Sequence, residues 1–312
     1  MRINRTMLTA LAIAFFLCVP DARSKEGSFT VVYTNSLNGH LDYCHCKEDP
    51  KGGLVKRATE IRALRTRYGD PLLVETGDFF AYETDPLLAE YVVKAYARIG
   101  YDAIAPGDQE FSGGIELITA HRYALPLLSD NLLVYDLFAW QPLFRRATAV
   151  ERGGLKIGII GSMHPDSFRY YPAKITDRVR VIDQLAEIRR DITALTAAGA
   201  DFIILLSHSG YENDVALQKA LPGVGLIVGG HSQTMIGTPL PAAGSLIVQA
   251  GSNGAHIGIL ELTVRDGKIV SFRNSFRLPD DTQPDDDPEI RALIREYEKK
   301  AEAESSKLRF RQ

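Results

Sequence analysis

The chain has 312 residues, of which 45% are apolar and 24% are charged, and its formal net charge is −3. Such a mildly acidic protein has no electrostatic reason to bind nucleic acid, so we expect no nucleic-acid partner. With three cysteines in this length, the chain is not a disulfide-stapled scaffold, and a hydrophobic core must hold it together.

The first 24 residues have the pattern of a secretory signal peptide. Residues 1–5 carry basic charge, residues 7–19 are apolar, and Ala22 and Ser24 form a small-x-small end. The apolar run is shorter than the roughly 20 residues that span a bilayer, and no later run is long enough. We therefore expect cleavage before Lys25, a net charge of about −5 afterwards, and a periplasmic or secreted protein without a transmembrane segment.

Beyond the leader, short apolar runs alternate with longer helical patterns. The short runs predict strands at Phe29–Tyr33, Leu72–Glu75, Ala103–Ala105, Leu125–Leu128, Lys156–Ile160, Phe202–Leu206, Leu226–Val228, Ser245–Val248 and Ile257–Val264. The longer patterns predict helices at Leu54–Tyr68, Pro86–Ile99, Ile115–Arg122 and Val181–Ala198. Strand–helix alternation indicates a layered α/β fold, and the last strand opens a hairpin with residues 268–276.

The end of the chain differs in composition from this region. Residues 279–288 are rich in Asp and Pro and indicate a linker, and residues 289–305 predict a charged helix. We therefore divide the chain into a signal peptide (1–24), an α/β domain (25–278) and an acidic linker with a C-terminal helix (279–312).

Polar loops follow five of the predicted strands. They are Thr34–Gly39, Thr76–Asp78, Pro106–Phe111, Ser207–His208 and Gly229–Gln233. Ligands of open α/β sheets bind at the carboxyl ends of strands, so we expect these loops to converge. A single Gly-Asp or histidine would be an ordinary turn or structural residue. Together, the Asp, His and Gln side chains predict a site for a divalent metal such as Zn²⁺, Mn²⁺ or Fe.

These loops resemble the calcineurin-like metallophosphoesterases, specifically the catalytic domain of the secreted 5′-nucleotidases. The family pattern runs Thr-Asn-Asp-x-His-Gly, Gly-Gly-Leu, Gly-Asp, Gly-Asn-His-Glu-Phe-Asp, Ser-His and Gly-Gly-His-Ser-His/Gln. The matching segments here are Thr34–Gly39, Gly52–Leu54, Gly77–Asp78, Gly107–Ser112, Ser207–His208 and Gly229–Gln233. The resemblance covers nearly all residues after the leader. It implies a four-layer α-β-β-α sandwich with one or two metal ions at the strand ends.

The resemblance implies one well-supplied metal position and one weakened one. The first would be held by four residues, with an aspartate where the family has an asparagine; they are Asp78, Asp108, His208 and His231. The second would share Asp78 with Gln233. There, Ser36 and Asn38 replace a carboxylate and an imidazole, and such neutral donors bind a divalent ion weakly.

The proton-donating residues of the family are also replaced. Its acid dyad, a histidine with a supporting aspartate, corresponds here to Gln109 and Ser112. Glutamine cannot act as a general acid, and losing such a group typically costs roughly 10²–10⁴ in rate. Substrates with good leaving groups, such as diesters or activated esters, would therefore be favoured.

New donors follow the weakened position. Cys44 and Cys46 lie six and eight residues after Asn38, and His40 and His45 lie in the same segment. An Asn-Gly followed by Cys-x-Cys and Gly-Gly-Leu resembles a divergent, exported subgroup of the family. Thiolate binds Zn²⁺ and Fe strongly, so the pair could serve as additional metal ligands or in redox chemistry. A local disulfide or an ordinary reduced pair are the alternatives.

Three functional hypotheses follow. The first is an exported metal-dependent hydrolase of the phosphoesterase class, acting on a small phosphorylated substrate. The second is a metal-binding pseudoenzyme without hydrolytic activity, and the third is a thiol or redox protein using Cys44 and Cys46. His164 and the pair Tyr170-Tyr171 are lesser candidates for the same site. The sequence does not identify a protein partner.

Overall fold

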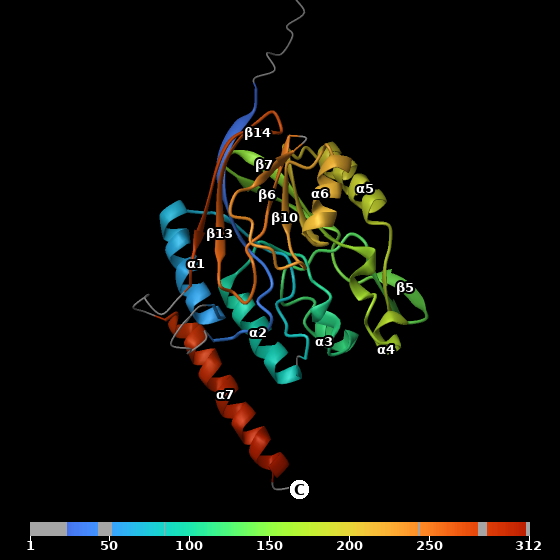
Figure 1. The fold of residues 1–312 in the computed structure, drawn as a ribbon, viewed down its shortest axis with the longest axis vertical. Coiled ribbons are helices and arrows are strands. Elements are labelled where there is room, and N and C mark those ends of the chain that lie inside the picture. Colours follow the sequence, from blue (N-terminus) through green and yellow to red (C-terminus); the bar gives the residue numbers. More distant parts are fainter. Residues whose placement is uncertain (1–23, 43–51, 84, 243, 280–285, 310–312) are drawn as a thin grey trace, which may run out of the picture.

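The computed structural model describes residues 24–42, 52–83, 85–242, 244–279 and 286–309 (Figure 1). Residues 1–23 of the predicted leader lie outside this range, and so do Cys44, His45 and Cys46. Among the described residues, no helix combines the length and the apolar character needed to cross a membrane.

Two sheets make up the centre of the fold. The first has the strand order β14 (Lys268–Arg277), β13 (Ile257–Arg265), β1 (Glu26–Thr34), β2 (Leu72–Glu75) and β3 (Ala103–Ile104). The second has the order β11 (Leu240–Ala242), β12 (Ser245–Val248), β10 (Leu226–Gly229), β9 (Phe202–His208), β7 (Leu155–Met163) and β6 (Ala147–Arg152). Within each sheet a parallel group, β1–β2–β3 or β12–β10–β9–β7, is flanked by antiparallel strands.

Helices cover the outer faces of both sheets. On the first sheet lie α1 (Leu54–Tyr68), α2 (Pro86–Ile99) and α3 (Ile115–Ala120); on the second lie α5 (Gln184–Ala197) and α6 (Tyr211–Ala220). A third core of buried Val, Leu, Ile and Phe side chains lies between the two sheets. The order helix, sheet, sheet, helix confirms the predicted four-layer α-β-β-α sandwich (Figure 1).

Local sequence explains why these elements begin and end where they do. The side chain of Asp85 accepts a hydrogen bond from the backbone N of Leu88, and Pro86 occupies the first turn, so α2 starts there. Gly100 takes a left-handed conformation with φ 73° and ends α2. All residues of β2 are buried, as an inner strand covered on both faces requires.

The last helix, α7 (Pro288–Arg309), packs beside α1 and α2. Ile290 and Ile294 belong to the core under those helices, and the ring of Tyr297 lies 5.7 Å from that of Tyr91. Its C-terminal part extends away from the body (Figure 1). The helix predicted at residues 289–305 is therefore confirmed, and one of its faces contributes to the core instead of being wholly solvated.

Two sequence predictions of elements were wrong. Leu125–Leu128 is not a strand. It forms only two isolated bridges, one from Leu127 to Ile104 and one from Leu128 to Arg145. The helix expected from Val181 starts at Gln184, since Val181 ends β8 (Val179–Val181), which forms a small third sheet with β4 (Leu132–Asp136) and β5 (Ala139–Pro142). The sequence patterns also missed β4, β5, β6, β8, β11, α6 and the short helix α4 (Ala173–Thr176). The predicted hairpin is confirmed as β13 and β14.

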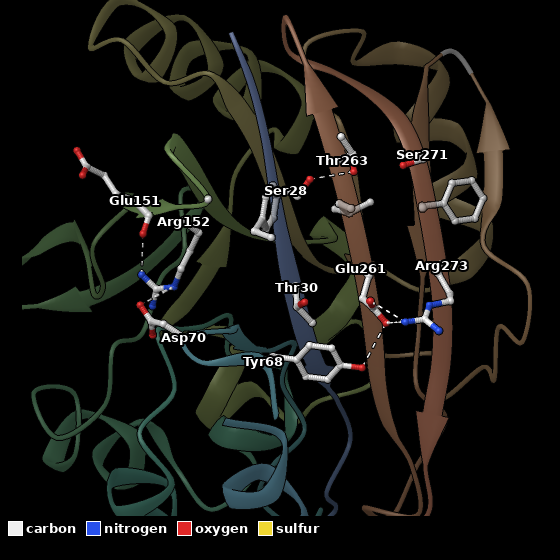
Figure 2. Close-up of a pocket in the computed structure, with 14 residues that line it drawn as sticks. Ser28, Thr30, Tyr68, Asp70, Glu151, Arg152, Glu261, Thr263, Ser271 and Arg273 are labelled. Atoms are coloured by element: carbon white, nitrogen blue, oxygen red, sulfur yellow. Dashed lines mark hydrogen bonds and ion pairs between the residues drawn. The ribbon is translucent and has the colours of Figure 1, made fainter. Parts of the chain in front are cut away.

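A pocket of about 620 Å³ lies at the start of β1, at the opposite end of that strand from the polar loop 35–39 (Figure 2). Two ion pairs lie along its lining: Arg273 contacts Glu261 at 2.6 Å, and Arg152 contacts Asp70 at 3.3 Å. Tyr68 also donates a hydrogen bond of 3.2 Å to Glu261. The two arginines of this pocket are therefore engaged by carboxylates of the protein itself, which leaves them less available to an anionic ligand.

Candidate metal centre

The polar loops after the parallel strands meet where the two sheets come together. Thr76, just after β2, donates a hydrogen bond of 2.8 Å to the carbonyl of Gly229 at the end of β10. Asn35, just after β1, accepts a hydrogen bond of 2.8 Å from the backbone N of Ala250, after β12. The backbone N of Asn253 donates to the carbonyl of Ser36 at 2.7 Å. These bonds tie strand ends of one sheet to those of the other and bring the predicted loops together.

The backbone in these loops is unusually strained. Six residues other than glycine have positive φ angles there: Ser36, Asn38, Asp78, His231, Gln233 and Asn253. Such conformations cost free energy and persist where the surroundings impose them, typically at functional sites. Gly107 allows a close approach to the site, because a Cβ atom at this position would lie 2.4 Å from Oδ1 of Asp78.

Four of the predicted metal ligands converge. One ligand atom from each of Asp78, Asp108, His208 and His231 lies within 4.8 Å of the others. Oδ1 of Asp108 is 3.1 Å from Nε2 of His208 and 3.1 Å from Nδ1 of His231. Nε2 of His208 is 3.4 Å from Oδ1 of Asp78 and 3.3 Å from Nδ1 of His231.

These distances between ligand atoms suit a single metal ion shared by the four residues. Ligand atoms about 2.0–2.1 Å from a metal in tetrahedral geometry are about 3.3 Å apart. The donor types, two carboxylates and two imidazoles, are those that Zn²⁺, Mn²⁺ and Fe accept. Asp78 and His208 are fully buried, whereas the side chain of His231 is 41% exposed and leaves that side of the cluster open. The four residues therefore fit a divalent cation that a ligand could reach from the side of His231.

The surrounding structure orients His208 for this task. Its Nδ1 lies 2.8 Å from the carbonyl oxygen of Thr76, which can only accept a hydrogen bond, so Nδ1 carries the proton. The other ring nitrogen, Nε2, therefore faces Asp78 and Asp108. Fixing a ligating histidine through its second nitrogen is the usual arrangement in metal sites.

The electrostatics of the cluster reflect its two carboxylates. Burial raises the pKa of Asp78 to about 6, although the nearby His208 opposes this. Burial alone would also raise the pKa of Asp108, but hydrogen bonds to His208 and His231 hold it well below its usual range. Burial would lower the pKa of His208, but Asp78 and Asp108 raise it to about 10. The two carboxylates thus favour a positive charge at this point, which a proton or a cation can supply.

Glu110 is a structural part of the site that the sequence did not reveal. It is fully buried, and Oε2 accepts hydrogen bonds from the backbone N of Asp78 at 3.0 Å and of Gly107 at 2.5 Å. Its Oε1 accepts a hydrogen bond of 2.9 Å from the backbone N of Phe80. One carboxylate therefore holds together the loops that carry Asp78 and Asp108. Spacing alone cannot show this, because its partners are backbone groups.

Tyr171 also belongs to the site, although the sequence singled it out only as a lesser candidate. Its hydroxyl donates a hydrogen bond of 2.8 Å to Oδ2 of Asp108. Burial, followed by the charge of Asp108, raises the pKa of Tyr171 well above its usual value, so it stays a proton donor. His164 lies nearby through its backbone N, which donates to the carbonyl of His208 at 3.2 Å, but its ring accepts a hydrogen bond from the backbone N of Asp166.

The residues of the second predicted metal position form a different kind of cluster. Asn38 donates hydrogen bonds of 2.7 Å to Oδ1 of Asn253 and 3.4 Å to Oε1 of Gln233. Its own Oδ1 accepts a hydrogen bond of 3.3 Å from Nε2 of Gln109. The structure thus places Asn38 beside Gln233, which was assigned to the same position, and adds Gln109 and Asn253, which were not. We call these four residues the amide cluster.

Gln109 and Ser112, the residues at the positions of the family's acid dyad, are not joined by a hydrogen bond between their side chains. The hydroxyl of Ser112 donates to the backbone carbonyls of Gln109 at 2.8 Å and Ala81 at 3.3 Å, and not to the side chain of Gln109. Ser36 is fully buried, and its hydroxyl accepts a hydrogen bond of 3.2 Å from Asn35. Neither residue supplies a charge. The predicted role of Cys44 and Cys46 falls outside the described residues and stays a prediction.

Comparison with known proteins agrees with this geometry. No protein-family model matches the chain. It is 28% identical to a snake venom 5′-nucleotidase from Naja atra, over 86% of this chain and 56% of that protein. The chain spans about half the length of the curated relatives it matches.

Solved structures show the same fold. A 5′-nucleotidase precursor from Thermus thermophilus superposes with a TM-score of 0.78 at 26% identity, covering 88% of this chain and 59% of that one. A calcineurin-like phosphoesterase from Bacillus subtilis gives 0.72 at 20% identity, covering 88% of this chain and 98% of that one. The sandwich, the loops at its strand ends and these likenesses together identify the chain as a metallophosphoesterase domain of the 5′-nucleotidase type.

Proposed function

We propose that this protein is an exported, metal-dependent phosphoric ester hydrolase with a divergent metal site. One observation carries the proposal: Asp78, Asp108, His208 and His231 bring four suitable ligand atoms within 4.8 Å of one another at the strand ends. A bound divalent cation would supply Lewis-acid polarisation of a phosphoryl oxygen and lower the pKa of water.

The chain's own residues would position this chemistry. Thr76 sets the tautomer of His208, Glu110 holds the loops of Asp78 and Asp108, and Tyr171 orients Asp108. A small phosphorylated substrate would approach from the exposed side of His231. Because the relatives are named 5′-nucleotidases, 5′-nucleotides are the alkyl esters to compare with aryl esters.

Leaving-group protonation would be weak in this site. Gln109 occupies the position of the family's acid, and its amide donates to Asn38 and cannot release a proton. We therefore expect aryl phosphate esters to be hydrolysed far faster than alkyl esters, since aryl leaving groups need no proton. A rate that is independent of leaving-group pKa would show that another residue supplies the proton.

The central experiment is metal analysis of the purified protein combined with assays on aryl phosphate mono- and diesters. Asp78→Ala and His208→Ala should each lower metal content sharply and abolish metal-dependent hydrolysis. Asp70→Ala, whose side chain is 80% exposed, is the matched control and should change neither. Metal content that is unchanged in both site variants would refute the proposal.

Export is the part of the proposal that rests on the sequence of residues 1–24. The name of the snake venom relative agrees with it, because venom is a secretion. N-terminal sequencing of protein recovered from the native extracytoplasmic compartment should start at Lys25. A mature chain that retains residues 1–24 would disprove cleavage at this site.

A metal-binding pseudoenzyme is the second candidate. The observation that favours it is the neutral amide cluster, in which Gln109 and Asn38 replace the acid and a metal ligand of active relatives. This candidate predicts bound metal without turnover of any aryl ester. A thiol function of Cys44 and Cys46 would instead show as an activity lost in Cys44→Ser/Cys46→Ser but kept in Asp78→Ala.

A further inference from the structure

The position of a second metal ion in this fold carries no charged ligand of its own among the described residues. Apart from Asp78, which belongs to the four-residue cluster, the side chains there are hydroxyl and amide groups. They are those of Ser36, Asn38, Gln109, Gln233 and Asn253. Neutral oxygens alone bind Zn²⁺, Mn²⁺ or Fe weakly, because affinity depends on carboxylate, imidazole or thiolate donors.

The amide groups are also engaged with each other. Both ends of the Asn38 amide have partners: Oδ1 accepts from Gln109 at 3.3 Å, and Nδ2 donates to Asn253 at 2.7 Å. Nδ2 also donates to Gln233, at 3.4 Å. A cation here would have to compete with these hydrogen-bond donors for the oxygens of Asn38, Gln233 and Asn253. The cluster is therefore a self-contained neutral network.

The first metal position has a negatively charged ligand that the second position lacks. Asp108 is a carboxylate whose Oδ1 lies 3.1 Å from both His208 and His231. With Asp78 it gives this one position two negative charges, which balance one divalent cation. The charge is thus concentrated where the four ligand atoms already converge.

We propose that the centre holds a single divalent cation and that its substrates are monoanionic phosphodiesters. This inference rests on the proposed hydrolase function. The two ligand carboxylates already cancel the charge of one divalent cation, so the centre then carries no net positive charge. A second cation would make the centre strongly positive and so attract a dianionic monoester. With a single cation, the second negative charge of the monoester has no positive charge to balance it. The electrostatic interaction of one such charge is strong in a partly buried site, because little water screens it. The NH₂ groups of the neutral amide cluster can donate hydrogen bonds to the phosphoryl oxygens of a monoanionic diester.

The first test is the number of cations that the full chain binds. Protein loaded separately with Zn²⁺, Mn²⁺ or Fe²⁺ and freed of excess metal should hold one equivalent by elemental analysis. Asp108→Ala should lose it, and the exposed control Asp177→Ala should keep it. Ser36→Asp/Asn38→His restores a carboxylate and an imidazole and should raise the content to two equivalents.

The outcomes separate the inference from the proposed function. Two equivalents in the unaltered chain, with metal-dependent hydrolysis, would overturn the single-cation inference and leave the hydrolase proposal standing. If the Cys44→Ser/Cys46→Ser variant then binds only one equivalent of cation, the cysteine thiolates complete the second metal position. No bound cation under any loading would overturn both. One equivalent that survives Asp108→Ala but not Cys44→Ser/Cys46→Ser would also overturn the inference, because the cation would lie elsewhere.

The second test concerns the charge of the substrate. Bis(p-nitrophenyl) phosphate is a monoanion and p-nitrophenyl phosphate a dianion, and both release the same leaving group. The ratio of kcat/KM for the diester to that for the monoester should be at least about tenfold higher in the unaltered chain than in Ser36→Asp/Asn38→His loaded with two cations. An equal or lower ratio in the unaltered chain would disprove the charge argument. If the double variant does not fold, a kcat/KM in the unaltered chain that favours the monoester would overturn it.

Discussion

The hydroxyl of Tyr171 donates a hydrogen bond of 2.8 Å to Oδ2 of Asp108, while Oδ1 of the same carboxylate faces His208 and His231. One oxygen is thus held by the protein so that the other is aimed at the candidate metal position. This division of roles predicts that the tyrosine orients the ligand without being one itself.

Tyr171→Phe should therefore lower metal affinity by roughly 10–100-fold, the usual effect of losing an outer hydrogen bond to a ligand. Titration with Zn²⁺ or Mn²⁺ measures this directly. Tyr170→Phe is the matched control, because Tyr170 is 88% exposed and should leave the affinity unchanged. Equal affinities for both variants would show that the bond to Asp108 has no role in orientation.

Glu110→Gln should destabilise the protein by about 1–3 kcal/mol, since the new NH₂ group cannot accept a hydrogen bond and one buried backbone N–H loses its acceptor. Asp78 and Gly107 depend on this carboxylate, so metal content should fall as well. Urea unfolding and elemental analysis provide the two readouts. Glu116→Gln, with a side chain that is 72% exposed, should stay within about 0.5 kcal/mol of the parent. A stable Glu110→Gln variant with full metal content would contradict the bracing role.

A buried ion pair supports the strand that leads to Asp78. Arg57 lies 3.0 Å from Glu75, and neither side chain is exposed to solvent. Removing one partner leaves an uncompensated buried charge, so Arg57→Met should cost about 3–5 kcal/mol in the free energy of unfolding. Neutralising the second partner in Arg57→Met/Glu75→Gln should recover part of that loss, because the glutamine can keep the hydrogen bonds to Thr34 and Tyr96. Strictly additive losses would exclude coupling between the two residues.

The raised pKa of Asp130, a residue outside the four-residue cluster, leads us to expect that the stability of the protein changes with pH. Burial raises its pKa to about 8 in the folded protein, against about 3.9 for an unfolded aspartate. Between these values the folded state binds one more proton than the unfolded state. Its contribution to stability is therefore complete below about pH 4 and is lost as the pH rises towards 8, by up to about 1.4 kcal/mol per pH unit.

Asp130→Asn should remove this slope, so the variant should gain stability relative to the parent as the pH rises from 4 to 8. Denaturant unfolding at a series of pH values measures the difference. Asp177→Asn changes an exposed residue by the same chemistry and should track the parent at every pH. Parallel stability curves for the parent and Asp130→Asn would refute the prediction.

Much of the fold could be predicted from local patterns. The bounds of α1, α2, β2 and β12 match the sequence predictions, because apolar periodicity and end signals such as Asp85-Pro86 and Gly100 act within a few residues. Of the small third sheet, β5 was missed because it is partly exposed and has no apolar run, whereas β4 does contain a short run, Leu132–Tyr135, that was overlooked.

For the candidate site, the sequence by itself determined which donors follow which strands, and hence that Asp78, Asp108, His208 and His231 would meet once the strands lay parallel. Only the tertiary structure decided how these donors are held. The tautomer of His208 depends on a carbonyl 132 residues away in the chain, and the orientation of Asp108 on a tyrosine 63 residues away. Such partners belong to other elements, and backbone carbonyls and N–H groups occur at every residue. No spacing in the sequence therefore marks them, and only the packing of the two sheets brings them to the site.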